Sequence, residues 1–258
     1  MPEKNEPKTS HIGVPLRRAG QHLDQQLRRL LASRMLFFCL VTGAMAGFAL
    51  TEWAHSILHQ PSVPYLATLL ALVTALAGGI VLNAALNRSD QLELGSRGEK
   101  VVADALEPLR ALGYAVFHDI PGNGFNLDHV LVGPGGVFVI ETKARSKRGN
   151  ETITYRRDEI LVNGMQPDRD PLVQVKASRN WLAGVIKESC ALEPPMRGVV
   201  LFPGWFIEGS SSGREVWVLN EKILPRFIEQ EDAVLSEGDV ARIASMLASR
   251  SRGGTGGN

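Results

Sequence analysis

The stretch Leu127–Lys143, LDHVLVGPGGVFVIETK, decides how the second half of the chain folds. Two apolar runs flank the turn residues Gly133–Gly136, a pattern typical of a β-hairpin. The loop holds either two or four of these residues, and in both cases Val132 pairs with Val137. The sequence therefore predicts two antiparallel strands in a fixed register.

The same register brings two acidic side chains together. It places Asp128 directly opposite Glu141, and the alternation of side chains along a strand adds Lys143 to the face of Glu141. Opposed side chains are about 5 Å apart, and at an effective dielectric of about 20 two carboxylates repel there by roughly 3 kcal/mol. We therefore expect a divalent cation between the carboxylates, with the Lys143 ammonium beside it.

Composition narrows the classes of protein that fit. Lys and Arg number 28 against 27 Asp and Glu among 258 residues, so no global charge indicates a nucleic-acid partner. Of the two cysteines, Cys39 lies in an apolar segment and Cys190 beyond a long polar stretch, so no disulfide framework is expected. A reducing compartment is expected for the polar part.

Two apolar segments, Met35–Trp53 and Tyr65–Leu86, are each long enough to cross a bilayer as a helix. From residue 35 to 87 there is no Lys or Arg, and Glu52 is the only formally charged residue. A secretory signal fits less well, because 34 residues precede the apolar core and a second apolar segment follows it. The sequence predicts a two-helix transmembrane hairpin.

Arginines flank this hairpin at both of its ends. Five precede it, Arg88 and Arg97 follow it, and the connecting loop has no Lys or Arg. The positive-inside rule therefore places both ends, and everything after Asn87, in the cytoplasm of a multi-pass cell-membrane protein. We expect four regions: a basic cytoplasmic segment (1–34), the hairpin (35–87), a soluble domain (88–235), and a helix with a disordered tail (236–258).

Two features of the membrane part concern lipid and partner contacts. Residues 14–34 space leucines on one helical face among arginines, which favours either an interfacial helix on anionic lipid or a basic segment that only fixes topology. Gly43 and Gly47 form a G-x-x-x-G in the first span. That spacing allows a homodimer contact, but it arises easily in helices rich in Gly and Ala.

The soluble domain alternates helical and strand patterns, which favours an α/β sandwich around a mixed sheet. The expected elements, besides the hairpin, are a helix (96–112), a strand (114–117), two short strands (151–155 and 159–162), a helix (170–187), two strands (198–202 and 215–219) and a closing helix (240–247). The helix at 170–187 opens with Asp170 as N-cap and Pro171 at its first position.

The acids and the lysine fit the needs of metal-dependent phosphodiester hydrolysis. That reaction needs carboxylates to hold Mg²⁺ or Mn²⁺, a group that activates water, and positive charge for the transition state. Asp128 and Glu141 suit the first role, and Lys143 suits the second or third. Glu99, on the preceding helix, is expected either as a third oxygen ligand or as a group that holds a metal-bound water, and Gln174, on the later helix, is expected at the rim of the site as a polar group that orients it.

Each of these residues also has a plainer interpretation. Glu141 and Lys143 could form an ordinary ion pair at an exposed strand end. Ser96 and Glu99 match a capping box that would only start a helix, and Gln174 could be a solvated helix residue.

Nearby residues have weaker signals. His129 alternates to the opposite face of the sheet from Asp128, which favours a packed structural histidine over a ligand, and His118 has no assigned role. The basic stretch Arg145–Arg148 could contact phosphates, although charged loops are usually only solvated.

As an ordered set, the motifs resemble the nuclease-related domain (NERD) family, within the PD-(D/E)xK nuclease-like superfamily, over residues 96–219. The motifs are Gly98-Glu99 at a helix, Asp128–Val132, Gly136–Lys143, and Asp170-Pro171-Leu172-x-Gln174. The resemblance implies a restriction-endonuclease-like αβββαβ core in a nuclease domain spanning 88–235. It also implies metal and catalytic roles for Glu99, Asp128, Glu141 and Lys143, with Gln174 in support. Leu127 departs from the superfamily pattern, in which a proline often precedes the acid.

Together these observations predict a membrane-anchored, cytoplasmic nuclease that depends on Mg²⁺ or Mn²⁺ and hydrolyses DNA, with RNA as the other substrate. The alternative is a catalytically inactive module that binds nucleic acid or protein at the membrane. Transport through the two spans has little support, because neither span carries a charged residue deep enough to mark a pathway.

Overall fold

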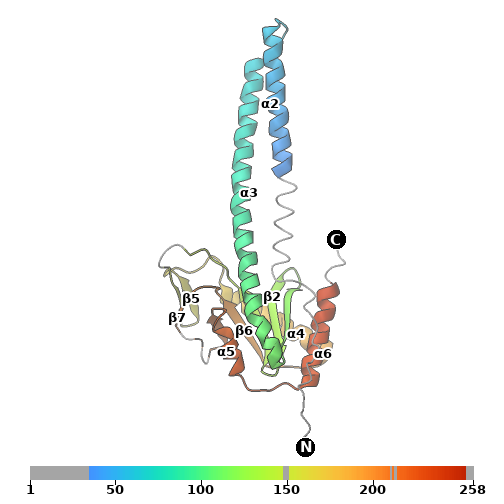
Figure 1. Ribbon diagram of the computed structural model, residues 1–258, viewed down its shortest axis with the longest axis vertical. Coiled ribbons are helices and arrows are strands. Elements are labelled where there is room, and N and C mark those ends of the chain that lie inside the picture. Colours follow the sequence, from blue (N-terminus) through green and yellow to red (C-terminus); the bar gives the residue numbers. More distant parts are fainter. Residues whose placement is uncertain (1–34, 148–150, 210, 212–213, 254–258) are drawn as a thin grey trace, which may run out of the picture. The chain divides into compact units, whose positions relative to one another are not determined.

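The computed structural model of the protein describes residues 35–147, 151–209, 211 and 214–253 (Figure 1). The chain divides into two compact units, which meet between Glu93 and Leu94. The predicted interfacial helix at 14–34 and the glycine-rich tail from residue 254 lie outside the described residues.

The first unit contains two long apolar helices, α2 (Leu36–Ile57) and the first part of α3 (Pro64–Leu106). By length and composition, both are long and apolar enough to cross a membrane. They pack against each other through small and aromatic side chains: Trp53 Nε1 donates to Thr68 Oγ1 at 2.9 Å, and the Trp53 and Tyr65 rings meet edge to face. Helix α2 extends beyond the predicted end at Trp53.

The second unit begins inside α3, not at a helix start. The predicted helix start at Ser96 is wrong, because the residues immediately before it are already helical and their carbonyls accept from the backbone N–H groups there. Ser96 and Glu99 therefore form no capping box. Helix α3 ends at Leu106, and a 3₁₀ helix, η2 (Glu107–Leu112), follows it.

A five-stranded mixed sheet forms the centre of this unit, in the order β1-β2-β3-β6-β8. Strands β1, β2 and β3 pair antiparallel, whereas β3, β6 and β8 pair parallel. A separate small sheet has the order β5-β4-β7. The strands are β1 (Ala115–Pro121), β2 (Asn126–Gly133), β3 (Gly136–Thr142), β4 (Ile153–Arg156), β5 (Glu159–Val162), β6 (Met196–Leu201), β7 (Ile207–Gly209) and β8 (Val216–Leu219).

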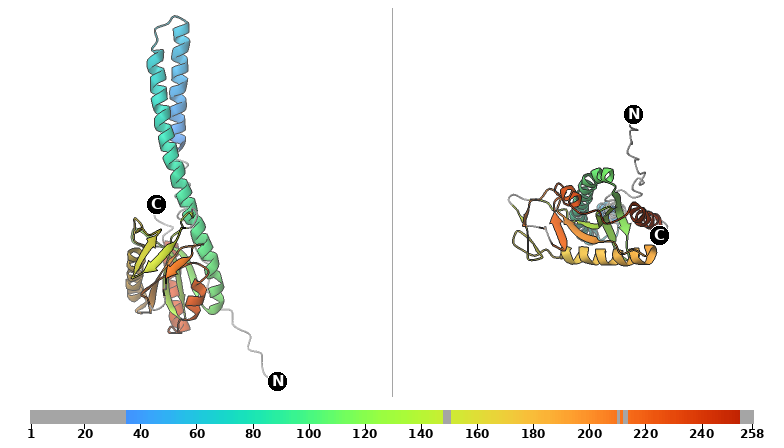
Figure 2. Two further views of the ribbon diagram at one scale, coloured as in Figure 1. Left: turned by 90° about the vertical axis from the view of Figure 1, so that its left-hand side faces the viewer. Right: turned by 90° about the horizontal axis from the view of Figure 1, so that it is seen from below.

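Helices cover both faces of the five-stranded sheet. Helix α4 (Pro171–Cys190) packs on β3 and β6, and α6 (Glu237–Gly253) packs on β1 and β2, all within one apolar core. The opposite face packs against the last turns of α3, η2 and α5 (Leu224–Glu229). The right-hand view of Figure 2 shows α4 in gold along one side of the strands and the green end of α3 along the other.

The β2–β3 hairpin has the predicted register. Val132 pairs with Val137, and Gly133 pairs with Gly136, so the loop holds two residues. Gly136 has φ +118°, and a Cβ there would lie 2.6 Å from the Pro195 carbonyl oxygen. Only glycine accepts both constraints without strain, which explains its place in the turn.

The N-terminus of α4 is capped as predicted. The Asp170 side chain accepts from the Leu172 N–H at 2.8 Å, and Pro171 occupies the first helical position. The helix is longer than expected, ending at Cys190. The short elements β7 and α5 had no clear periodicity in the sequence and were not predicted.

Two histidines pack together on the α3 side of the sheet. The Nδ1 atoms of His118 and His129 lie 2.8 Å apart, and His129 is 0% exposed, so the prediction of a packed structural histidine is confirmed. Burial lowers the pKa of His118 to about 4, opposed mainly by Glu107, and burial lowers the pKa of His129 well below its usual value. Both rings are therefore neutral at physiological pH.

This pair predicts a loss of stability in acid. The pKa of His118 is about 4 in the folded protein and about 6.5 in the unfolded chain, so the unfolded state takes up more protons as pH falls through that window. Between pH 7 and 4.5 the free energy of unfolding should fall by about 2 to 3 kcal/mol more in the wild type than in His118→Gln. Urea unfolding followed by tryptophan fluorescence measures both profiles, and parallel profiles would contradict the prediction.

Candidate functional site

All five residues expected at the site lie toward one end of the sheet, with Glu141, Lys143 and Gln174 in contact on the face covered by α4. Asp128 lies near the start of β2, and Glu141 near the end of β3. Lys143 follows β3 directly, Gln174 lies in the first turn of α4, and Glu99 is in the part of α3 that belongs to this unit. Residues far apart in the sequence are therefore gathered by the sheet and the two helices that flank it.

Glu141, Lys143 and Gln174 form a closed triangle of hydrogen bonds. Lys143 Nζ donates to Glu141 Oε1 at 2.7 Å and to Gln174 Oε1 at 2.8 Å, and Gln174 Nε2 donates to Glu141 Oε1 at 2.6 Å. Two residues of separation put Glu141 and Lys143 on one face of the extended chain, and the cap at Asp170 fixes the turn of α4 that carries Gln174. The amide thus links the helix to the strand end.

This triangle of hydrogen bonds distinguishes the two interpretations of Glu141 and Lys143, as groups of a functional site or as an ordinary exposed ion pair. Glu141 is only 6% exposed, so the pair it makes with Lys143 is not the exposed ion pair of a solvated strand end. Gln174 is exposed on its helix, yet both ends of its amide are bonded to the other two side chains. A buried carboxylate held by a lysine and an amide is a more specific arrangement than chance surface pairing provides.

Asp128 is held by the backbone of the neighbouring strand. The paired residues of β2 and β3 end at His129 and Ile140, and the next step of that register places Asp128 opposite Glu141. There the Asp128 carboxylate accepts from the Thr142 N–H at 2.7 Å. The side chain therefore takes a backbone donor at the point where the strand pairing stops.

Burial raises the pKa of both acids of the hairpin, and neighbouring carboxylates add to the rise at Asp128. Burial raises the pKa of Asp128 well above its usual value, and the charges of Glu141 and then Glu99 raise it further, against the Thr142 N–H and Lys143. Burial also raises the pKa of Glu141, while Lys143 and Gln174 oppose that rise. Three carboxyl groups thus share a region in which negative charge is unfavourable without a cation.

Glu99 approaches this region because α3 lies very close to the end of β3. A Cβ added to Gly98 would lie 2.5 Å from the Ala144 Cβ, closer than real side chains come. The missing side chain at Gly98 allows this approach, and Glu99 is the next residue of the helix. Since Glu99 caps no helix start, its charge beside Asp128 is its notable feature.

The donor set suits a hard divalent cation, since Asp128, Glu141 and Glu99 offer only carboxylate oxygens. The raised pKa of Asp128, to which Glu141 and Glu99 contribute, is the observation that fits such an ion, because bound positive charge would relieve it. Within the described residues, however, no group of three or more His, Cys, Asp or Glu side chains is arranged to hold a metal ion. The carboxylates therefore suit a divalent cation chemically, but the three acids are not arranged around a common metal position.

One acid beside the site was not found from the sequence. Asp119 is buried in β1 with φ +53°, and its Oδ1 accepts from Asn126 Nδ2 at 2.7 Å. The pairs His118–His129 and Ile120–Leu127 lie on either side of the step that joins Asp119 to Asp128. Predicting that Asp119 lies next to Asp128 requires knowing how β1 pairs with β2. The sequence between these strands has no turn signal as clear as that of the β2–β3 hairpin.

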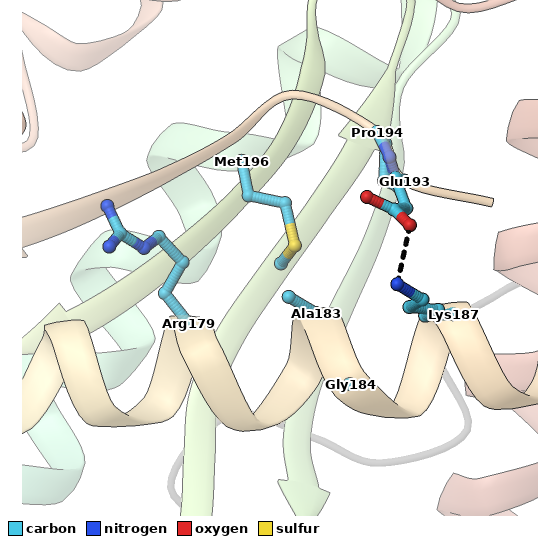
Figure 3. A pocket seen from close by; sticks show the side chains of 7 residues that line it. All are labelled: Arg179, Ala183, Gly184, Lys187, Glu193, Pro194 and Met196. Atoms are coloured by element: carbon cyan, nitrogen blue, oxygen red, sulfur yellow. Dashed lines mark ion pairs between the residues drawn. The ribbon is translucent and has the colours of Figure 1, made fainter.

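The described cavities lie away from these residues. One of about 340 Å³ lies between α4 and the segment before β6, where Figure 3 shows Lys187 paired with Glu193 and the Met196 side chain beside Ala183. Another, of about 580 Å³, is lined by Arg197, Trp217 and residues of α5. Neither contains any of the five expected site residues.

Two acids, a lysine and a glutamine at one end of a mixed sheet are what the resemblance to the PD-(D/E)xK nuclease-like superfamily predicted. Residues 94–203 match the family model of the nuclease-related domain, NERD, so the family predicted from the motifs is confirmed for this part of the chain. No curated protein and no solved structure matches the chain.

The Gly98 contact predicts a sharp difference between two glycines in helices. Gly98→Ala should lower the free energy of unfolding by about 1–3 kcal/mol, because the new methyl group meets Ala144. Gly184→Ala, where a Cβ meets nothing within 4 Å, should raise it by up to about 1 kcal/mol through helix propensity alone. Urea unfolding of the two variants and the wild type gives the comparison.

A compensating substitution tests the cause. Ala144→Gly removes the atom that the new methyl group would meet, so the double variant Gly98→Ala/Ala144→Gly should recover most of the stability lost by Gly98→Ala. Additive losses in the double variant would show that the close approach of α3 and β3 is not the constraint.

Proposed function

We propose that this protein is a membrane-anchored nuclease that depends on a divalent cation and hydrolyses phosphodiester bonds of nucleic acid, with DNA as the first substrate to test. The observation that carries the proposal is the buried Glu141, bonded to Lys143 and Gln174 beside Asp128, inside the segment that matches the nuclease-related domain. The order of α3, β1, β2, β3, α4 and β6 supports a restriction-endonuclease-like αβββαβ core.

Asp128 and Glu141 would hold Mg²⁺ or Mn²⁺, with Glu99 as a further oxygen ligand. When bound, the ion supplies Lewis-acid polarisation of the phosphate and a more acidic water. The raised pKa values of Asp128 and Glu141 support this assignment, since a pair of carboxyls that resist ionisation together gains most from bound positive charge.

The other groups of the site hold the acids in position and would neutralise charge on the substrate. Lys143 places an ammonium 2.7 Å from Glu141, where it can stabilise charge that develops on a scissile phosphate. Gln174 holds Glu141 and Lys143 together, and the Thr142 N–H fixes the Asp128 carboxylate. These supports keep the reacting groups in place before the substrate arrives.

The apolar helices α2 and α3 supply the proposed anchor in the bilayer. The positive-inside rule supports a cytoplasmic nuclease domain, because the arginines lie outside the loop between the helices. A homodimer through α2 remains part of the proposal: nothing lies within 4 Å of a Cβ built at Gly43 or Gly47, so that face of the helix is open to a second copy.

Cleavage assays on the full chain in detergent micelles test the proposal. Nucleic acid should be cut with Mg²⁺ or Mn²⁺, and EDTA should stop the reaction. Glu141→Gln should lower turnover at least about a hundredfold while the circular dichroism spectrum stays unchanged, because it removes one charged ligand and little volume.

The matched control is Glu193→Gln, which makes the same change at an exposed carboxylate that pairs with Lys187 far from the site. It should cut at the wild-type rate. Cleavage by Glu141→Gln at the rate of this control would rule out the assignment of the site.

A second function is favoured by one observation. Within the described residues the acids are not gathered around a metal position, and Glu141 is already bonded to Lys143 and Gln174. That arrangement also suits an inactive module that binds nucleic acid or protein at the membrane. Binding without cleavage across Mg²⁺, Mn²⁺ and both DNA and RNA would support this second function.

A further inference from the structure

Exposed aromatic rings lie on both sides of the candidate site. Phe206 is 74% exposed and follows the buried Trp205, in the segment that leaves the end of β6. Phe125 is 38% exposed and comes directly before β2, three residues from Asp128. Both rings thus leave apolar surface accessible near a polar site.

On the Phe206 side, the rings are tied to the basic segment that follows β3. Trp205 Nε1 donates to the Arg145 carbonyl oxygen at 3.4 Å, and Lys147 Nζ lies 5.7 Å from the centre of the Trp205 ring. Arg145 and Lys147 are exposed and follow Lys143 by two and four residues. An exposed ring and two exposed cations therefore stand next to the end of the site strand. Arg148, also expected in this basic stretch, lies outside the described residues.

On the Phe125 side, the ring is supported by α4. The Phe125 and Trp181 rings meet edge to face with centroids 5.2 Å apart, and the Arg250 guanidinium lies 5.3 Å from the centre of the Trp181 ring. Trp181 follows Gln174 by seven residues, which is two helical turns, so both lie on the same side of α4. This edge again combines an exposed ring with a cation.

On each side an exposed phenylalanine adjoins a tryptophan that carries a cation over its ring, and this combination matches one kind of ligand. Unpaired bases stack on aromatic side chains, and the phosphates that join them pair with Lys and Arg. In a duplex the base faces are covered by neighbouring bases, so a phenylalanine ring would gain nothing from it. We infer that the site takes single-stranded nucleic acid, with bases on Phe125 and Phe206 and phosphates on the neighbouring cations.

This inference rests on the proposed function, whose substrate it narrows. A protein partner would also cover exposed phenylalanines, but Lys147 and Arg250, which lie over the neighbouring Trp205 and Trp181 rings, complement phosphate charge. Phe125 comes before β2 and Phe206 after β6, the two strands that flank the strand bearing Glu141. The two rings thus offer a base platform before and after the scissile position.

Binding without cleavage tests the inference separately from catalysis. The full chain in detergent micelles, with EDTA present, is titrated into a fluorescently labelled short DNA or RNA single strand and into the blunt duplex of the same sequence. Anisotropy should show tighter binding of the single strand. Phe125→Ala and Phe206→Ala should each weaken single-strand binding at least about fivefold and leave duplex binding unchanged.

Three further variants separate stacking from charge and from general apolar contact. Lys147→Ala should weaken both ligands and lower the salt dependence of binding by about one unit of slope, whereas the phenylalanine variants should leave that slope unchanged. Phe206→Tyr, unlike Phe206→Ala, should bind the single strand with the wild-type affinity, since tyrosine keeps an aromatic face for stacking. Val234→Ala, at an exposed apolar residue next to the β2–β3 turn at the other end of the sheet, should behave as wild type.

The outcomes divide cleanly. Equal affinity for single strand and duplex, or phenylalanine variants that behave like Val234→Ala, would overturn the inference even if the protein cuts duplex DNA. Single-strand binding that depends on both rings, with no cleavage under Mg²⁺ or Mn²⁺, would uphold the inference and reject the proposed nuclease activity.

Discussion

The structure of the site depends on how one buried carboxylate is compensated. Glu141 lies at the end of β3 with little access to water, and its charge is balanced by Lys143 and by the amide of Gln174. Leaving such a group unpaired would cost several kcal/mol. The same contacts join the strand to α4 and so determine where the helix begins relative to the sheet. Stability and chemistry therefore place the same demand on these three side chains.

The two faces of the sheet divide structural and chemical roles. On the α4 side, β2 and β3 end in acids whose pKa values are raised by burial, with the charge of Glu141 adding to the rise at Asp128. On the α3 side, the residue next to Asp128 is His129, paired with His118 and kept neutral by burial. Strand alternation alone produces this division, because neighbouring residues point to opposite faces. One short segment of β2 thus serves both the core and the site.

Much of the hairpin and of the site could be predicted from the sequence, because these features depend on short stretches of neighbouring residues. The hairpin register followed from the Gly133–Gly136 turn, and the Glu141–Lys143 contact followed from strand periodicity. The cap at Asp170 and Pro171 fixed the start of α4, which is why Gln174 could be named. The prediction of a helix start at Ser96 was wrong because it depended on context. Ser96 and Glu99 have the residue types of a capping box, but α3 begins more than thirty residues earlier, and no local sequence pattern shows that the helix continues.

Other features had no sequence signal because they arise only on assembly. Gly98 could be recognised as part of a motif, but the reason for a glycine there could not. A Cβ at this position would lie 2.5 Å from the Ala144 Cβ, in a segment more than forty residues away along the chain. The position of Asp119 beside Asp128 needed the pairing of β1 with β2. Exposed rings such as Phe206 become meaningful only once their neighbours are known.

The cover that α6 gives to β1 and β2 has a consequence for biosynthesis. Residues of α6 complete the core over these two strands, and they are translated after every strand of the sheet. While the ribosome is still adding them, the apolar side of the strand bearing Asp128 stays open, and domains generally form as whole units. The apolar helices α2 and α3 are translated before the sheet, so they leave the ribosome while the nuclease-related domain is still incomplete. A ribosome that stalls before α6 would leave an incomplete and inert product.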